Sequence, residues 1–165
     1  MERRNAWLSY NEADEKALEK LAKDYRTFLD NGKTERECVS ELSREAEAAG
    51  YVSLDKKLAS GEKIQTGDKI YAVGMKKIMA LFHIGEDPME KGMNILGAHI
   101  DSPRLDVKQN PLYEDTDLAY LDTHYYGGVK KYHWVALPLA IHGVIVKKDG
   151  TVVNVTVGEV EDDPV

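Results

Sequence analysis

The fold is decided by residues 94–106, which read NILGAHIDSPRLD. Residues 95–98 form a short apolar run that is typical of a strand buried on both faces, although a buried helical segment can share this pattern. Pro103 ends any regular element close behind it, because proline lacks an N–H group and restricts the residue before it. Side chains along a strand repeat every two residues, so we expect His99 and Asp101 to point to the same face at the C-terminal end of this strand.

An imidazole and a carboxylate that lie together where a strand meets a loop can bind a metal ion or share a proton. In the functional interpretation, His99 is a metal ligand and Asp101 lies beside the metal, where it orients an imidazole or a neighbouring ligand. The alternative is an ordinary buried histidine followed by a loop aspartate that caps Ser102 or Arg104. The His-x-Asp pattern alone does not separate the two, because three-residue patterns are common by chance.

The longer string at residues 97–105, GAHIDSPRL, resembles the signature of the aspartyl-aminopeptidase family of zinc aminopeptidases. A second stretch begins with YYGG at residues 125–128 and continues through Trp134 to the apolar run at 144–147. It resembles the Tyr-Gly-Gly segment of that family and the strand that follows it. The N-terminal helices and residues 68–73 also fit, so the resemblance covers nearly all of the chain.

The resemblance implies a cytoplasmic enzyme with two zinc ions per active site that removes N-terminal residues, in some members acidic ones, from peptide substrates. It places the first histidine ligand of the family on His99 and the catalytic aspartate that flanks the metal on Asp101. The other ligands of the family are a bridging aspartate, a glutamate pair that contains the general base, a later aspartate and a C-terminal histidine. They fall beyond position 165, so we expect this chain to be the N-terminal part of the enzyme and to be inactive alone.

The fold class implied is α/β: the N-terminal part of an α/β/α catalytic domain of the zinc-peptidase type, followed by the start of an inserted all-β dimerisation domain. The division is predicted near Pro111, because no helical stripe of useful length follows it. Residues 1–111 are the predicted catalytic part, and residues 112–165 are the incomplete β-rich part through which we expect a homo-oligomer. An open sheet edge and an uncovered apolar face are expected to make the isolated chain associate or fold poorly.

Two helices are predicted from capping boxes, Ser-x-x-Glu at residues 9–12 and Thr-x-x-Glu at residues 34–37. Apolar residues recur behind each box at steps of three and four, which is the stripe of an amphipathic helix. They are Leu18, Leu21, Tyr25, Phe28 and Leu29 in the first helix, and Cys38, Val39, Leu42, Ala46 and Ala49 in the second. The first helix is expected to end at Gly32 with a left-handed cap, and the second at Gly50. Residues 51–66 are expected to be an irregular loop.

Short β-favourable runs predict the remaining elements. Residues 69–73 and 78–82 flank a short link that contains glycine, which favours a hairpin. Apolar and charged residues alternate over 105–108, as in a half-exposed strand that Pro111 would end. Residues 144–146 and 152–157 flank Asp-Gly, which is a strong hairpin signal.

Composition excludes several classes of function. A net charge of −7 and a pI near 5.3 argue against a dominant nucleic-acid-binding surface. No apolar run approaches the length needed to span a membrane, and the N-terminus lacks the apolar core of a signal peptide. The single cysteine, Cys38, excludes an intramolecular disulfide and a multi-cysteine zinc site, and it is expected to be a small core residue. A cytoplasmic location follows as a prediction.

Other polar residues offer weaker candidates. His124, His133 and His142 have no recognised metal-ligand spacing. His124 precedes the YYGG stretch, and we keep the hypothesis that it reaches an active site across an oligomer interface. Arg104 could bind a substrate carboxylate, but pairing with Asp101 or Asp106 to hold the loop is the favoured interpretation.

Three rival interpretations stay open. A related two-zinc hydrolase, such as a carboxypeptidase or a deacylase, could use the same His-x-Asp strand. The chain could instead be a non-catalytic oligomerisation or binding module, or a truncated paralogue that no longer binds metal. Acidic and histidine ligands in the reading frame after Val165 would separate the enzymes from the other two.

Overall fold

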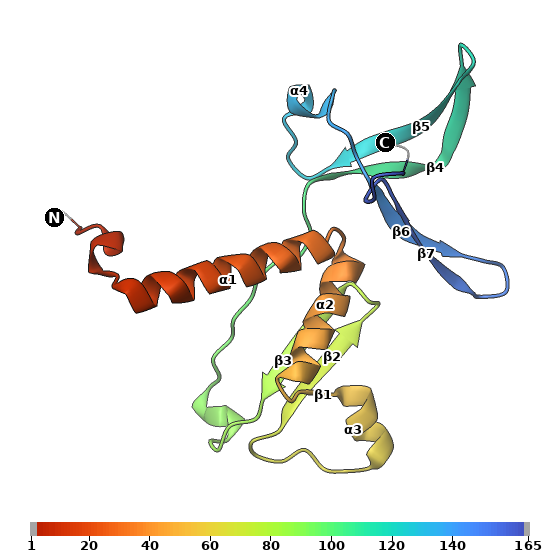
Figure 1. The fold of residues 1–165 in the computed structure, drawn as a ribbon. Coiled ribbons are helices and arrows are strands. Elements are labelled where there is room, and N and C mark those ends of the chain that lie inside the picture. The colour runs from red at the N-terminus through yellow and green to blue at the C-terminus, as the bar shows by residue number, and fades with distance from the viewer. Residues whose placement is uncertain (1–2, 164–165) are drawn as a thin grey trace. The chain divides into compact units, whose positions relative to one another are not determined.

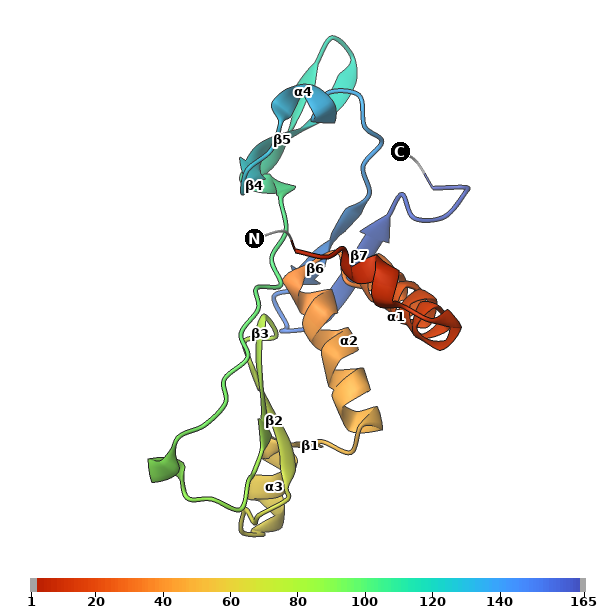
Figure 2. The ribbon, with the colours of Figure 1, turned by 90° about the vertical axis from the view of Figure 1, so that its left-hand side faces the viewer.

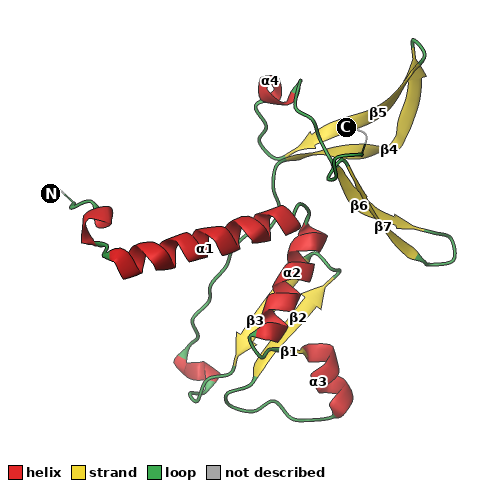
Figure 3. Ribbon diagram, in the orientation of Figure 1, coloured by secondary structure: helices red, strands yellow, loops and turns green. Residues whose placement is uncertain are grey.

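The computed structural model describes residues 3–163 and is a mixed α/β structure, as the sequence predicts. The chain divides into two compact units, one ending at Gly97 and the other beginning at Ala98. Figure 3 shows that the helices are concentrated in the first unit and that strands dominate the second. The predicted boundary near Pro111 concerns the domains of a longer enzyme and stays a prediction.

Helix α1 (Glu12–Asn31) begins two residues later than its predicted capping box would place it. Asn11 is the N-cap, its side chain accepts from the amides of Ala13 and Asp14, and the Asp14 carboxylate accepts from the Asn11 amide. Ser9 belongs instead to a 3-10 turn (η1, Ala6–Ser9), where its hydroxyl donates to the Ala6 carbonyl. The Ser9 box was wrong because asparagine caps as well as serine does, and Asp14 closes the reciprocal bond in place of Glu12.

Helix α2 (Glu35–Ala48) begins at the predicted box, in which Thr34 and Glu37 exchange bonds between backbone and side chain. Gly32 precedes it with φ −111°, so the expected left-handed cap of α1 is absent at this position. A Cβ at residue 32 would lie 2.9 Å from the Cys38 sulfur. Close approach of the two helices, rather than a left-handed backbone, therefore explains this glycine.

A three-stranded sheet completes the first unit in the order β1-β2-β3. Strands β2 (Lys69–Gly74) and β3 (Ile78–His83) form the predicted antiparallel hairpin. The segment expected to be an irregular loop contains β1 (Val52–Ser53), parallel to β2, and the short helix α3 (Leu54–Ser60), which ends at the left-handed Gly61. Helix α2 packs along β2 and β3, as Figures 1 and 2 show from two directions.

The core of the first unit is small. Its buried apolar residues are Cys38, Val39 and Ala46 from α2, and Ile70 and Tyr71 from β2. Successive residues of a strand point to opposite faces, so the burial of both Ile70 and Tyr71 means that the central strand is covered on both sides. The Tyr71 hydroxyl donates to Glu47 Oε1 at 2.8 Å, which fastens β2 to the end of α2.

The predicted buried strand at residues 95–98 was wrong. This stretch follows the 3-10 turn η2 (Met89–Lys91) without regular structure, and Leu96 is 99% exposed. A strand exists only when a neighbour completes its ladder, and no strand within residues 3–163 pairs with this stretch. The burial expected from its apolar composition is also absent, because composition does not supply the neighbouring strands.

In the second unit, β4 (Arg104–Asp115) and β5 (Leu118–Tyr126) form a long antiparallel hairpin. The predicted break at Pro111 was wrong, because β4 continues through this residue. The register shifts between Val107 and Leu112, and a proline is tolerated where a ladder is interrupted, since its missing N–H breaks no pair there. Thr116 and Asp117 make the turn with φ of 52° and 63°. This positive-φ turn was not predicted from the sequence, because neither residue is glycine.

A second hairpin pairs β6 (Ile141–Val146) with β7 (Val152–Val157), as predicted. Gly150 supplies the expected positive φ of 85°, and Asp149 Oδ1 accepts from the Thr151 amide at 2.9 Å. Between the hairpins lies α4 (Lys131–Trp134), a single helical turn. The described part of this unit is therefore β-rich.

Candidate functional site

His99 and Asp101 lie side by side, although no strand aligns them. The His99 Nδ1 atom is 2.9 Å from the backbone carbonyl of Asp101 and 3.5 Å from Asp101 Oδ1. The His99 side chain is 84% exposed and that of Asp101 is 43% exposed. The two side chains predicted to act together thus lie close to each other in a segment without regular structure.

The contact with the carbonyl fixes the tautomer of the neutral His99 ring. A carbonyl oxygen can only accept, so Nδ1 carries the proton and donates it. The Nε2 atom then keeps its lone pair, and within residues 3–163 it has no partner. Metal-binding histidines are commonly held in this way, with one ring nitrogen donating to a carbonyl or carboxylate and the other binding the ion. The ring therefore fits the role of a zinc ligand.

Asp101 is held by a residue far along the chain. The Tyr126 hydroxyl donates to Asp101 Oδ2 at 3.0 Å. This hydrogen bond is the main cause of a pKa of Asp101 below its ordinary value, and the backbone amide of Asp101 and the nearby His99 act in the same direction. The carboxylate is thereby favoured in its charged form, which suits a group beside a metal ion.

Tyr126 was not among the residues predicted to act at the site. The feature of the sequence that could have identified it is its position as the first residue of the Tyr-Gly-Gly segment. That segment served only to support the resemblance. Arg104 follows the favoured interpretation, because its Nε lies 2.7 Å from Asp106 Oδ1. Its guanidinium carbon also lies 4.1 Å from the centre of the Tyr126 ring, a cation–π contact.

The other histidines of the second unit, His124, His133 and His142, lie in different surroundings. His124 is exposed on β5 opposite Asp106, and it borders a hollow of about 460 Å³ beside the irregular part of β4. The ring of His133 packs edge-on against Tyr132, and His142 Nε2 lies 2.9 Å from Glu159. No group of three potential metal ligands is assembled within residues 3–163. His124 at a neighbouring active site stays a hypothesis.

Cys38 behaves as the core residue that was predicted. It is buried and outside any disulfide, and its sulfur lies 3.3 Å from the Gly32 carbonyl oxygen. Burial, followed by the charges of Glu37 and Glu35, raises the pKa of the thiol. A thiol held in its protonated form is a poor nucleophile.

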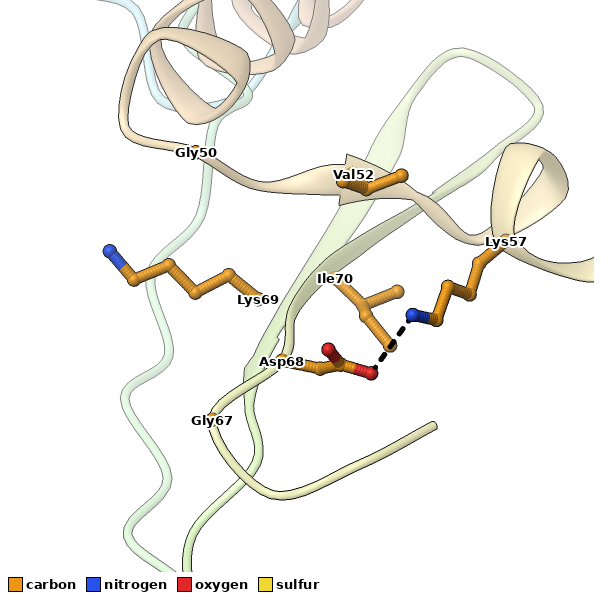
Figure 4. A pocket seen from close by; sticks show the side chains of 7 residues that line it. All are labelled: Gly50, Val52, Lys57, Gly67, Asp68, Lys69 and Ile70. Carbon is orange, nitrogen blue, oxygen red and sulfur yellow. Dashed lines mark ion pairs between the residues drawn. The ribbon is translucent and has the colours of Figure 1, made fainter. Parts of the chain in front are cut away.

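A hollow of about 200 Å³ lies in the first unit beside the start of β2 (Figure 4). Lys57 from α3 reaches Asp68 across it, with Nζ 3.2 Å from the carboxylate, and it also pairs with Glu62. The Asp68 carboxylate accepts from the Gln65 amide as well. These bonds close the loop between α3 and β2, so we assign this hollow a structural role.

Solved structures share this fold. Aminopeptidase I from Borrelia burgdorferi superimposes with a TM-score of 0.90 at 37% identity, and the match covers 98% of this chain and 39% of the other. The M18 aminopeptidase of Thermotoga maritima gives a TM-score of 0.88 at 41% identity, covering 99% and 35%. Aminopeptidase I from Clostridium acetobutylicum gives 0.84 at 58% identity, covering 99% and 36%. The fold is therefore that of a part of an aminopeptidase.

Sequence comparison gives the family. The model of the Aminopeptidase I zinc metalloprotease (M18) family matches residues 28–165. The M18 family aminopeptidase 1 of Clostridium acetobutylicum is 59% identical over 164 residues, which are 99% of this chain and 35% of that protein. The chain belongs to the M18 family, the aspartyl aminopeptidases, and spans about 35% of the length of the curated relatives it matches.

The family is one of zinc metalloproteases, in agreement with the cofactor that the resemblance implied. None of the helices in residues 3–163 is both long enough and apolar enough to cross a membrane.

Proposed function

We propose that this chain is part of a two-zinc aminopeptidase that removes N-terminal residues from peptides, with acidic N-terminal residues as the first substrates to test. His99 binds one zinc ion through Nε2, and Asp101 lies beside the metal. The observation that carries this proposal is the fixed tautomer of His99, whose Nδ1 proton is bound to the Asp101 carbonyl. Membership of a zinc metalloprotease family supports it.

Bound zinc would supply a Lewis acid for the scissile carbonyl and a bound water of lowered pKa. Residues of this chain orient and charge the groups around the zinc position. The Asp101 carbonyl orients the His99 ring, and the Asp101 carboxylate, kept charged by Tyr126, favours a cation beside it. The general base and the remaining ligands are expected in the part of the enzyme that follows this chain in its relatives.

The 165 residues are expected to have no peptidase activity by themselves. Catalytic zinc commonly needs three protein ligands. The described residues bring one imidazole and one neighbouring carboxylate together, and no larger ligand group forms among them.

The wider organisation is part of the same proposal. Residues 1–111 belong to the catalytic domain, and residues 112–165 begin a β-rich domain through which the enzyme forms a homo-oligomer. Apolar side chains exposed on both hairpins, among them Leu112 on β4 and Ile145 on β6, support an interface on this part. The cytoplasmic location is supported by a chain with one cysteine, which is buried.

The test compares this chain with a form extended through its reading frame to the length of its relatives. Zinc content and release of N-terminal Asp, Glu and Leu from short peptides are measured for both. We expect two zinc ions and peptidase activity in the extended form, and neither in the 165-residue chain. His99→Ala should remove activity in the extended form and lower its zinc content, whereas His133→Ala, at an exposed histidine of α4, should leave both unchanged. An extended protein that binds no metal, or that keeps full activity with His99→Ala, contradicts the proposal.

A further inference from the structure

We infer that Tyr126 is a positioning residue of the zinc site, because it locks Asp101 and, through Asp101, the orientation of His99. The inference rests on the proposed function for the metal. Its direct observation is the 3.0 Å hydrogen bond from the Tyr126 hydroxyl to Asp101 Oδ2. We refer to Tyr126 and Gly127 together as the latch.

The β4–β5 hairpin delivers the latch to the loop that carries His99. Tyr126 is the last residue of β5 and pairs in register with Arg104, the first residue of β4. Asp101 precedes the ladder by three positions. A side chain as long as tyrosine, at the end of the partner strand, can therefore reach back along the chain to this carboxylate. Residues 98–103 have no ladder of their own, so this bond connects them to regular structure.

The ring of Tyr126 is itself held in place. The Arg104 guanidinium lies over it at 4.1 Å and is fixed in turn by the 2.7 Å bond from its Nε to Asp106 Oδ1. Cross-strand contacts of this kind stabilise a hairpin and restrict the side chains that make them. A restricted ring loses less conformational entropy when its hydroxyl binds, so the hydrogen bond to Asp101 costs less to form.

The second part of the latch is backbone. Gly127 has φ of 76°, which favours glycine, and a Cβ at this position would lie 3.4 Å from Pro103 Cα. The chain after β5 therefore packs directly against the proline that follows Asp101 and Ser102. The loop is held at two points, by the hydroxyl at Asp101 and by the backbone at Pro103.

Holding Asp101 also holds His99. The two residues are joined by the bond from Nδ1 to the Asp101 carbonyl and by the 3.5 Å approach of Nδ1 to Oδ1. The ring is otherwise exposed, so its direction depends on Asp101. Loss of the Tyr126 hydroxyl should leave Nε2 present but less well directed, which weakens metal binding without removing a ligand.

The test uses the full-length enzyme with Tyr126→Phe, which removes the hydroxyl and keeps the ring under Arg104. The matched control is Tyr120→Phe, on the same strand, where the ring stacks on Tyr113 at 5.2 Å. Three quantities are measured: amide hydrogen exchange of residues 99–104 in the metal-free protein, the zinc dissociation constant by chelator competition, and kcat and KM. Asp101→Asn is combined with Tyr126→Phe to complete a double-mutant cycle.

We expect Tyr126→Phe to speed exchange over residues 99–104 and to weaken zinc binding about tenfold, in the range found for partners that orient metal ligands. It should lower kcat more than it changes KM, and Tyr120→Phe should change none of these. In the Asp101→Asn background, Tyr126→Phe should have little further effect, because the group it acts through has already changed.

Unchanged exchange and unchanged zinc affinity in Tyr126→Phe would overturn the inference. So would an equal loss of zinc affinity in the presence and absence of Asp101→Asn, because Tyr126 would then act by another route. A wild-type enzyme without bound zinc would overturn the proposed function alone. In that case faster exchange in Tyr126→Phe would support the latch, and unchanged exchange would refute it.

Discussion

Replacement of Ile70 tests how much of the first unit depends on its small core. Ile70 lies on the central strand β2 and is 2% exposed, the lowest value among the buried residues of the described chain. Ile70→Val removes one buried methylene, which is worth about 0.8 kcal/mol. Ile70→Ala removes more of the side chain and leaves a cavity, at a cost of about 3 kcal/mol. The neighbouring hollow, which Ile70 lines, should let the surroundings relax and keep the cost below the top of the usual range.

The assay is urea unfolding of the 165-residue chain, followed by helical circular dichroism, because α1, α2 and α3 all belong to the first unit. With an m value of about 1.5 kcal/mol/M, the midpoint should fall by about 0.5 M for Ile70→Val and about 2 M for Ile70→Ala. Measurements at several protein concentrations separate unfolding from association. A domain has only about 5–15 kcal/mol of stability in total, so Ile70→Ala should remove about a fifth to three fifths of it.

The matched control is Ile78→Ala on the adjacent strand β3, where the side chain is 67% exposed. Its effect should stay within about 0.5 kcal/mol, as for most surface substitutions. Equal midpoint shifts for Ile70→Ala and Ile78→Ala would refute the reasoning, because burial would then not decide the cost.

Two further predictions concern a pH-dependent contact and a strained turn. The hydrogen bond from Tyr71, followed by Lys56, lowers the pKa of Glu47, so the unfolded chain binds the proton first as the pH falls. The first unit should therefore lose stability between the ordinary pKa of a glutamate and the lowered one. Tyr71→Phe should raise the pKa of Glu47 toward its ordinary value in a carboxyl NMR titration, and an unchanged titration would contradict the assignment. Gly150→Ala should destabilise the β6–β7 hairpin by about 1 kcal/mol, because φ is 85° there. The loss of stability is measured by hydrogen exchange of the β6 and β7 amides. The control is Gly143→Ala, because a Cβ at residue 143 meets no atom within 4 Å. Equal protection in both variants would contradict the explanation by backbone strain.

Local signals predicted most of the elements. The Thr34 box, the stripe of α2 and the Asp-Gly turn depend on residues that lie close together in the sequence, and the structure confirms each of them. The same local view placed the first cap on Ser9 because Asn11 with Asp14 offers an equally good box two residues later. Local signals also predicted that β4 ends at Pro111, because the irregular pairing with β5 at this point depends on residues far along the chain.

The features that were not predicted from the sequence depend on contacts with segments that are distant along the chain. Residues 95–98 have the composition of a buried strand, yet whether they form one is decided by strands that lie elsewhere. The pairing of His99 with Asp101 was predicted, because the residues are two positions apart. The bond from Tyr126 to Asp101 was missed, because a separation of 25 residues is closed only by the register of β4 and β5.

The hairpins have a consequence for the kinetics of folding. Three of the four strand pairings among the described residues are antiparallel hairpins, β2 with β3, β4 with β5 and β6 with β7. An isolated hairpin forms in about 1–10 μs, because its two strands are close together in the sequence. Each pair can therefore form during synthesis as soon as its second strand has left the ribosome. On this schedule the bond from Tyr126 to Asp101 forms once β5 is complete and does not wait for β6 and β7.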